Sequence, residues 1–342
     1  MIKQSTVLLA LVFVCLPLLS QEKTEIFTVL SYNVENLFDI HDDEHTADEA
    51  FTPGGEKQWT KERYKAKLQS LTGVLHSLPE KELPAVIGLC EIENRKVLED
   101  LVEMRGLKKA SYSIVHEEDH DPRGIECALL YNPDLFKYQE HELLPVVDQS
   151  DPDYLLRGIL YVKGKGPDGR TLHLYVNHWK SRGGGERETR KKRMAAAIAL
   201  RKHRDRLLAT DLDARVIIMG DFNDEPTNRS VLSGLSASGQ RRNIAMGDYY
   251  NLCYDLHNIE GSGTYAYRGK WNMLDQVIIS HSLVNQKKGL STSWEGVHIL
   301  IAEDMLYESE KYEKSLPSAT YGGPQYFGGP SDHLPLYVVF TY

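Results

Sequence analysis

Short apolar runs recur along the chain, and polar residues follow most of them. The clearest run is Val216 to Met219, four apolar residues of which three are β-branched. Such a run is typical of a strand that is buried on both faces. Further strands of this kind are expected at residues 27–32, 85–90, 125–131, 158–163, 171–176, 274–280 and 337–340.

Between these runs, apolar residues recur at helical spacing. Thr60 is a candidate N-cap for a first helix, and further helices are expected over 97–104 and 187–208. Residues 299–330 are rich in Tyr and Gly and irregular in pattern, which predicts a long surface loop. The apolar stripe of the first helix, which is expected to face the core, is Tyr64, Leu68, Leu71, Val74, Leu75 and Leu78.

The start of the 342-residue chain differs from the rest. A basic residue precedes an almost wholly apolar stretch over 7–19, which is typical of a signal peptide spanning 1–20. A lipid anchor on Cys15 is less favoured, because the residue before it is Val14 and not a small residue. No other apolar run is long enough to span a membrane. We therefore expect a secreted or periplasmic protein with a single domain over 21–342.

Charge limits how the protein can meet its partners. Without the first twenty residues, the chain carries 39 basic and 49 acidic residues. A protein that binds nucleic acid through bulk electrostatics should be basic, so contact with a polyanion has to come from local patches or from metal ions. Cys90, Cys127 and Cys253 are odd in number, which predicts buried thiols and no disulfide framework. No feature of the sequence implies an obligate protein partner.

Polar residues gather where the predicted strands end. Catalytic groups often lie just beyond the carboxyl ends of buried strands, although any one such pair is also explained by a polar turn. Carboxylates are ligands for a hard cation, and His residues can transfer protons, so the set suits hydrolysis of a phosphate ester. It comprises Asn33, Glu35, Glu91, His178, Asp221, Asn223, Asp275, Asp332 and His333.

Other polar segments have competing interpretations. The His-rich run over 41–45 is expected to be a solvated loop more than a metal site, and His116 and His120 are expected to face solvent. The basic, Gly-rich loop after His178 can expose N–H groups to an anion. Arginines then recur every three residues on the next predicted helix. They form either a solvent-exposed helix face or a rim that binds phosphate, and the sequence supports both interpretations equally. These arginines are Arg187, Arg190 and Arg193.

Six motifs together carry a resemblance to a known family. The chain resembles the endonuclease/exonuclease/phosphatase superfamily, which includes pancreatic-type deoxyribonuclease, apurinic endonucleases, sphingomyelinases and inositol-polyphosphate 5-phosphatases. The resemblance runs from Ser31 to Leu336 and implies an α/β four-layer sandwich, with two packed mixed β-sheets flanked by helices. The motifs are Ser-Tyr-Asn-Val-Glu-Asn (31–36), Leu-Cys-Glu-Ile (89–92), Asn-His-Trp-Lys-Ser (177–181), Gly-Asp-Phe-Asn (220–223), Leu-Asp-Gln-Val (274–277) and Ser-Asp-His-Leu-Pro (331–335).

The resemblance implies a metal-binding side of the site. Glu91 is the chief ligand of a divalent cation, with Glu35 and Asp332 beside it and Asn33 close to both the cation and the substrate phosphate. The expected cation is Mg²⁺, with Mn²⁺ or Ca²⁺ as alternatives. Further contacts to the substrate phosphate are expected from Lys180, Arg182 and Arg190.

The resemblance also implies the catalytic side. His333 is a base or a phosphate-polarising group oriented by Asp275, and Asp221 positions or deprotonates the attacking water. Asn223 donates to phosphoryl oxygens, and His178 is the expected acid.

Substrate is the least determined property, because one fold serves many substrates. Asp224 and Glu225 follow the 220–223 motif where the 5-phosphatases typically have Tyr-Arg, which argues against that branch. The chain looks most like bacterial extracellular nucleases, so nucleic acid is the expected substrate. A sphingomyelinase-like or small-molecule phosphoester hydrolase is an alternative, and so is a non-catalytic surface-binding module on the same fold.

Overall fold

The computed structural model describes residues 25–79, 82–148, 155–242 and 244–342. The predicted signal peptide over 1–20 lies outside the described residues. Among the described residues, no helix has the length and apolar character needed to cross a membrane.

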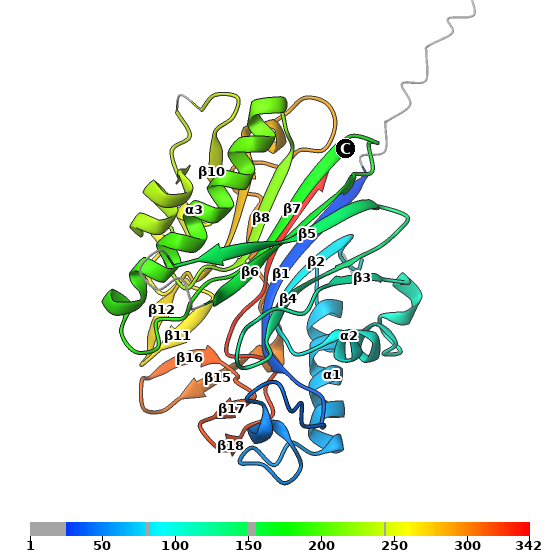
Figure 1. Ribbon diagram of the computed structural model, residues 1–342, viewed down its shortest axis with the longest axis vertical. Coiled ribbons are helices and arrows are strands. Elements are labelled where there is room, and N and C mark those ends of the chain that lie inside the picture. Colours follow the sequence, from blue (N-terminus) through cyan, green and yellow to red (C-terminus); the bar gives the residue numbers. More distant parts are fainter. Residues whose placement is uncertain (1–24, 80–81, 149–154, 243) are drawn as a thin grey trace, which may run out of the picture.

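Two mixed β-sheets form the middle of the molecule (Figure 1). The first sheet has the strand order β14-β19-β1-β2-β4-β3, and the second has the order β5-β6-β7-β8-β13-β10-β9. Pairing is parallel for β1 with β2 and for β7 with β8, and these two pairs bring strand ends to one edge. The strands of the first sheet are β1 (Ile26–Leu37), β2 (Val86–Ile92), β3 (Ser113–His116), β4 (Glu126–Tyr131), β14 (Val297–Ile299) and β19 (Leu336–Thr341).

The second sheet holds most of the strands that were predicted from the middle of the chain. Its members are β5 (Lys137–Val147), β6 (Leu155–Lys165), β7 (Thr171–His178), β8 (Val216–Asp221), β9 (Ala237–Ser238), β10 (Tyr249–Asn251) and β13 (Asp275–Ser280).

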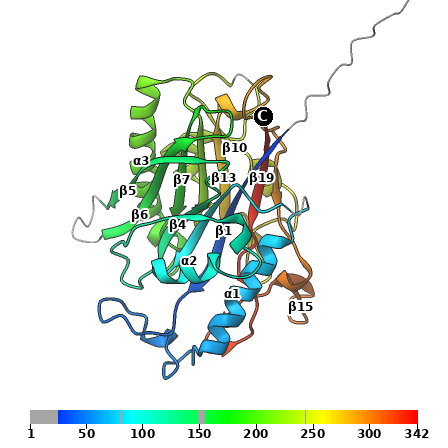
Figure 2. The ribbon, with the colours of Figure 1, turned by 90° about the vertical axis from the view of Figure 1, so that its right-hand side faces the viewer.

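Helices cover the outer faces of the sheets, and α1 and α3 lie on opposite sides of the strands (Figure 2). Helix α1 (Lys61–His76) begins after Thr60, whose side chain accepts the Arg63 N–H as predicted for an N-cap. Asn94 caps α2 (Arg95–Val102) in the same way, so this helix starts two residues before the predicted one. The remaining helical segments are α3 (Glu186–Thr210), α4 (Tyr254–His257), η1 (Glu49–Phe51), η2 (Lys108–Ala110), η3 (Ser230–Leu235), η4 (His281–Leu283) and η5 (Glu303–Met305).

Alternation along the strands divides the core into layers. In β8, Ile217 and Met219 pack between the two sheets, whereas Val216 and Ile218 pack toward α3. A third apolar cluster joins the outer face of the first sheet to α1 and α2. The arrangement is helix, sheet, sheet, helix, which confirms the predicted four-layer sandwich.

The segment over 299–330 was predicted to be an irregular surface loop, and this was wrong. It contains two small hairpins, β15 (Leu306–Ser309) with β16 (Lys314–Pro317) and β17 (Tyr321–Gly322) with β18 (Gln325–Tyr326). Met305 and Thr320 are buried here, so the segment packs below β1 (Figure 1). A further hairpin, β11 (Tyr265–Tyr267) with β12 (Lys270–Asn272), precedes β13.

Candidate active site

Regular pairing in the second sheet places three polar residues side by side. His178 ends β7, Asp221 ends β8 and Asp275 begins β13. His178 and Asp275 are both register partners of Asp221, so neighbouring strands carry the three residues at one level, about 4.8 Å apart. All three are nearly fully buried. The polar ends of β7 and β8 and the polar start of β13 therefore produce this half of the site directly.

The first sheet contributes its residues through two irregularities. The β1–β2 register shifts between Asn33 and Leu37, and the β2–β4 register shifts between Cys90 and Ile92. At these bulges Glu35 has φ 50° and Glu91 has φ 66°, a left-handed backbone that costs a non-Gly residue about 1–3 kcal/mol. A bulge commonly re-aims a side chain beside a functional site.

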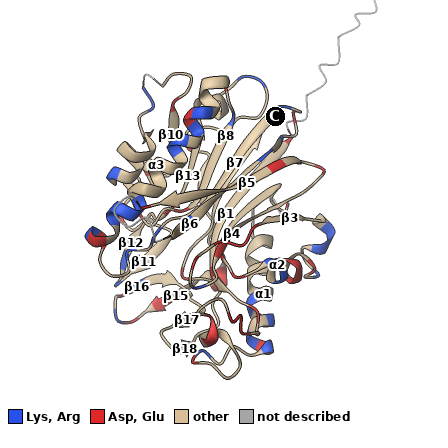
Figure 3. Ribbon diagram, viewed as in Figure 1, with Lys and Arg blue, Asp and Glu red and all other residues tan. Residues whose placement is uncertain are grey.

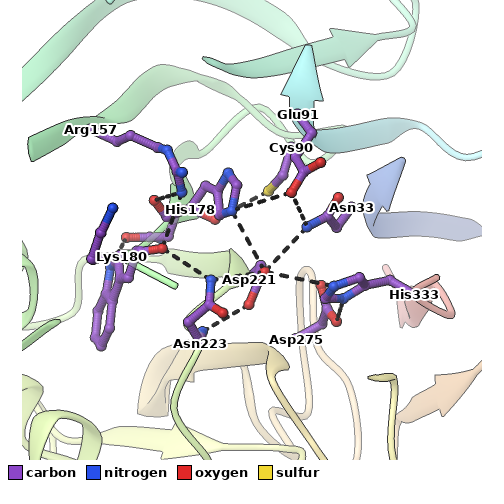
Figure 4. A network of polar contacts seen from close by, with 12 residues as sticks. Asn33, Cys90, Glu91, Arg157, His178, Lys180, Asp221, Asn223, Asp275 and His333 are labelled. Atoms are coloured by element: carbon purple, nitrogen blue, oxygen red, sulfur yellow. Dashed lines mark hydrogen bonds and ion pairs between the residues drawn. The ribbon is translucent and has the colours of Figure 1, made fainter. Parts of the chain in front are cut away.

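Asp221 lies at the centre of the polar network (Figure 4). Its Oδ2 accepts hydrogen bonds from the side-chain amides of Asn33 at 3.2 Å and Asn223 at 3.1 Å, and its Oδ1 accepts the Asn223 backbone N–H at 2.8 Å. The Nε2 atoms of His178 and His333 lie 3.7 and 3.9 Å from Oδ2, beyond hydrogen-bond length. Both imidazole nitrogens are thus close to one carboxylate without being bonded to it.

Glu91 faces the same space from the first sheet. Its Oε1 lies 3.4 Å from the Asn33 amide nitrogen and 3.7 Å from His178 Nε2, and its Oε2 accepts the Asn36 backbone N–H at 2.9 Å. The Asn33 amide therefore stands between the carboxylates of Glu91 and Asp221 and joins the two sheets. The second amide, of Asn223, is also fully used, because it donates to Trp179 O as well as to Asp221. It orients Asp221 in this structure.

His333 is held on both sides of its ring. Its Nδ1 contacts Asp275 Oδ2 at 2.7 Å, and its ring centroid lies 4.8 Å from that of Tyr265. Asp275 thus orients His333, the pairing that the resemblance implied. Tyr265 was missed by the sequence analysis, because a Tyr in a short strand of mixed pattern carries no signal.

The two histidines have opposite electrostatic surroundings. Burial disfavours a charged His333, but Asp275, Asp332 and Asp221 outweigh it and raise the pKa of His333 well above its usual value. Burial and the positive charge of Arg157 lower the pKa of His178 well below its usual value. Environments that push two pKa values apart assign different protonation states. The surroundings therefore favour the charged form of His333 and the neutral form of His178.

The structure also brings Glu35 and Asp332 to this edge, with different contacts. The Glu35 carboxylate accepts three backbone N–H groups, from Thr320, Tyr321 and Asp332. These bonds direct the Glu35 carboxylate toward the backbone of residues 320–332. Within the described residues, the Asp332 carboxylate makes no hydrogen bond or ion pair. Burial, then the charges of Glu35 and Glu91, raise the pKa of Asp332 to about 7.

The carboxylates of Glu91 and Asp332 suit a hard cation. Across the residues that the structure describes, no three His, Cys, Asp or Glu side chains converge into a ready-made metal cage. Mg²⁺ does not need one, because it keeps several waters and binds through one or two carboxylates. The unpaired Asp332 and the partly exposed Glu91 fit that donor set, since a cation would relieve the repulsion between them.

The predicted phosphate-binding cations are only partly at the site. Lys180 lies beside the network (Figure 4). Arg182 Nε donates to Asn223 O at 2.8 Å and thereby holds the turn that carries Asn223. Arg190 is exposed on α3 and lines a separate groove against β5 with residues such as Glu142. Arg193 fits neither of its two interpretations, because it is fully buried with its Nε 2.7 Å from an oxygen of Asp224.

Three further polar residues near the site carried weak sequence signals or none. Arg157 Nη1 donates to Trp179 O at 3.3 Å and so supports the turn after His178. Lys67 is buried beneath Glu35, and its position three residues after Tyr64, on the apolar stripe of α1, was an available signal. His116 was predicted to face solvent, but its side chain is 2% exposed and lies against Glu126, so that prediction was wrong.

Comparisons with known proteins agree with this fold. Solved structures with the same fold include an endonuclease/exonuclease/phosphatase family protein of Bacteroides thetaiotaomicron, at 17% identity and TM-score 0.58, with 94% of this chain and 96% of that chain covered. A mannosyl-6-phosphatase of Bacteroides thetaiotaomicron is similar at 18% identity and TM-score 0.56, covering 92% and 100%. D. rerio TDP2 complexed with a single-strand DNA product is similar at 16% and 0.53, covering 92% and 98%.

At these identities the solved structures show the fold alone, and a comparison of the sequence with curated proteins gave no match. The family model described as "Endonuclease/Exonuclease/phosphatase family" matches residues 28–341, which includes every residue of the polar network. The chain belongs to the endonuclease/exonuclease/phosphatase family, whose members hydrolyse phosphoester bonds.

Proposed function

We propose that this protein hydrolyses phosphodiester bonds in nucleic acid with the help of a divalent cation. The observation that carries the proposal is the convergence on Asp221 of two histidines and two amides from both sheets. A buried carboxylate beside imidazoles at a strand edge is an arrangement for moving a proton, and it exceeds what a polar turn needs.

The contacts suggest a division of labour among the protein groups. Asp221 accepts a proton from the attacking water, because its amide partners fix its orientation and burial raises its pKa to about 6. The Nε2 atoms of His333 and His178 have no hydrogen-bond partner within the described residues, so they are free to donate to phosphoryl oxygens. Asp275 keeps His333 oriented through Nδ1. Such preorganised donors stabilise charge that develops in a transition state.

Glu91 and Asp332 are the residues that would hold the cation. When bound, a divalent cation neutralises charge on a phosphoryl oxygen. The test for it is a titration of the protein with Mn²⁺ by calorimetry, beside the variant Glu91→Gln. We expect one or more saturable sites that this substitution weakens at least tenfold. Equal Mn²⁺ affinity in both proteins would remove Glu91 from the cation site.

Nucleic acid is favoured as substrate by the family resemblance and by one similar structure that holds a single-strand DNA product. Helix α3 carries nine Lys and Arg against three Asp and Glu, whereas α2 carries two of each sign (Figure 3). The experiment is a panel of supercoiled plasmid, single-stranded oligonucleotides and RNA with Mg²⁺ or Mn²⁺. Cleavage that is lost in His333→Ala and on chelation supports the proposal, and intact substrates after hours would contradict it.

A small phosphoester is the second candidate, and one observation favours it. Two arginines near the site are already used by the protein, because Arg123 donates to the Asn36 side chain and Arg182 to Asn223 O. Both guanidinium groups therefore already have partners within the protein. Phosphate release from sugar phosphates, or phosphocholine release from sphingomyelin, without cleavage of nucleic acid would select this candidate. Absence of every activity would favour a non-catalytic binding module.

We infer export from the apolar stretch over 7–19, which is typical of a signal peptide. The three cysteines of the described chain are free and buried, and export does not require them to pair. Cell fractionation of the producing organism, with mass spectrometry of the mature N-terminus, tests this. Recovery of the full-length chain in the cytoplasm would contradict it.

A further inference from the structure

We infer that Glu35 and Lys67 form a positioning clamp that holds residues 320–333 against the end of β1 and thereby fixes Asp332 and His333. The inference rests on the proposed function, because the clamp matters for catalysis only if these two residues act on a substrate. It replaces the metal-ligand role that was expected for Glu35.

Three backbone N–H groups donate to the Glu35 carboxylate. Its Oε2 accepts N–H groups from Thr320 at 2.6 Å and Asp332 at 2.9 Å, and its Oε1 accepts Tyr321 N–H at 3.0 Å. Thr320 directly precedes the β17–β18 hairpin, Tyr321 begins it, and Asp332 follows it in the chain. One carboxylate thus ties together the chain on both sides of the hairpin.

Lys67 is the second residue of the clamp, and it contributes from helix α1. Its Nζ donates to Glu35 O at 3.0 Å, Thr320 Oγ1 at 2.6 Å and Pro330 O at 2.7 Å. An ammonium group has three donors, so all of them are used, and the side chain is 2% exposed. A lysine buried at this depth is costly unless its contacts are satisfied. These contacts join β1 to Thr320, before the hairpin, and to Pro330, after it.

Two hydroxyl groups extend the clamp to the catalytic residues. Thr320 Oγ1 donates to Gly329 O at 2.9 Å, which closes the hairpin. Ser331 Oγ donates to Asn33 O at 2.8 Å and accepts the His333 backbone N–H at 3.0 Å. The position of His333 relative to Asp221 therefore depends on how firmly residues 320–333 are held to β1. A displacement of 1 Å can cost a large factor in rate.

The test compares Lys67→Met and Glu35→Gln with two controls. Lys65→Met alters an exposed lysine on the same helix, and Glu91→Gln alters the proposed cation ligand. Amide hydrogen exchange is followed by mass spectrometry on peptides covering 318–333, together with Mn²⁺ affinity, kcat and KM.

For a clamp, Lys67→Met and Glu35→Gln speed exchange in these peptides at least tenfold and leave distant peptides unchanged. In both variants kcat falls about 10- to 100-fold with KM changed less than threefold, added Mn²⁺ does not restore it, and the double variant is no worse than the poorer single one. Lys65→Met changes nothing. Glu91→Gln weakens Mn²⁺ binding without loosening the segment.

The inference is overturned if Glu35→Gln weakens Mn²⁺ binding as much as Glu91→Gln does while exchange over 318–333 stays unchanged. It is also overturned if exchange rises equally throughout the protein. If Lys67→Met does not fold, Thr320→Val removes one hydroxyl of the clamp and is measured in the same way. A wild-type protein without hydrolytic activity would sink the proposed function, and the exchange and Mn²⁺ results would still decide for or against the clamp.

Discussion

The two sheets build their halves of the site by different means. In the second sheet, His178, Asp221 and Asp275 sit at matching positions of regular strands, and strand register alone brings them together. In the first sheet, Glu35 and Glu91 sit on bulges with left-handed backbone. Regular pairing supplies the groups that face one another across strands, whereas the bulges supply carboxylates that regular strands would direct elsewhere.

This difference extends to what each half tolerates. The regular half depends on close backbone packing, and the side chains of Asp221 and Asp275 are held by hydrogen bonds. The bulged half depends on charge, since its carboxylates are offset by backbone amides and by one buried lysine. Substitutions that change side-chain volume should therefore destabilise the regular half most. Substitutions that change charge should destabilise the bulged half most.

The largest expected effect is that of Asp221→Asn, which keeps the shape of the regular half and removes its central charge. An amide cannot accept the proton of water, so kcat should fall at least about 10³-fold, equivalent to about 4 kcal/mol. Steady-state kinetics on the best substrate of the panel measure this. Asp213→Asn, on the surface, is the matched control, and a loss below tenfold at Asp221 would exclude it as the base.

Gly220→Ala tests the backbone packing of the same half. Gly220 has φ +124°, and an added Cβ would lie 2.0 Å from Asn177 O on the neighbouring strand. We expect a loss of about 3 kcal/mol in unfolding free energy, from the clash and the disfavoured backbone. Guanidinium denaturation measures it. Gly73→Ala, in an open position on α1, should instead gain about 1 kcal/mol, and equal effects at both sites would refute the argument.

Glu126→Gln tests charge in the bulged half, because Glu126 pairs with Ile92 next to the Glu91 bulge. Burial, then nearby acidic groups, raise the pKa of Glu126 to about 10, and burial lowers that of His116 to about 4. The folded state then holds the Glu126 proton more tightly than the unfolded state does. Its contribution to stability is intact below the unfolded pKa and declines as pH rises toward the folded one.

Glu126→Gln should therefore raise the unfolding free energy by about 2 kcal/mol at pH 8 and by almost nothing at pH 4. Urea denaturation at the two pH values measures the difference, with the exposed Glu310→Gln as control. A loss of stability at pH 8 would mean that Glu126 and His116, 3.7 Å apart, form an ion pair instead.

The smallest expected effect is that of Arg190→Ala. This arginine was a predicted phosphate contact, but it lines the groove between α3 and β5 and belongs to neither half of the site. We expect kcat/KM to change less than twofold on nucleic acid. Lys180→Ala, beside the network, should reduce it more, and the reverse order would place the groove in the path of the substrate.

Sequence patterns were sufficient for the parts of the molecule that follow simple periodicity. The strand ending at Asp221 and the helix capped by Thr60 form where apolar spacing and capping chemistry predict them. The site residues of the second sheet follow for the same reason. The strand-end pattern also marked Glu35 and Glu91 in the first sheet, but no periodicity reveals that these two residues adopt left-handed backbone.

The remaining features depend on contacts between distant segments. The apolar stripe of α1 marks the position of Lys67 as buried, but its partners Thr320 and Pro330 lie more than 250 residues further along the chain. Arg193 looks like one of a solvent-facing series of arginines, yet Asp224 draws it into the interior. The order of the 299–330 segment depends in part on Glu35, nearly three hundred residues earlier. Such pairings are a property of the tertiary structure, so local spacing does not contain them.

The Asn33 amide has a consequence for how the two sheets can move. It spans the gap between one carboxylate on each sheet, and an amide has no titrating proton, so this spacer keeps its form from acid to alkaline solution. Any sliding of one sheet across the other would have to stretch these contacts first. The Asn33 side chain has a fixed length, so it sets the distance between the Glu91 and Asp221 carboxylates and with it the spacing of the two sheets.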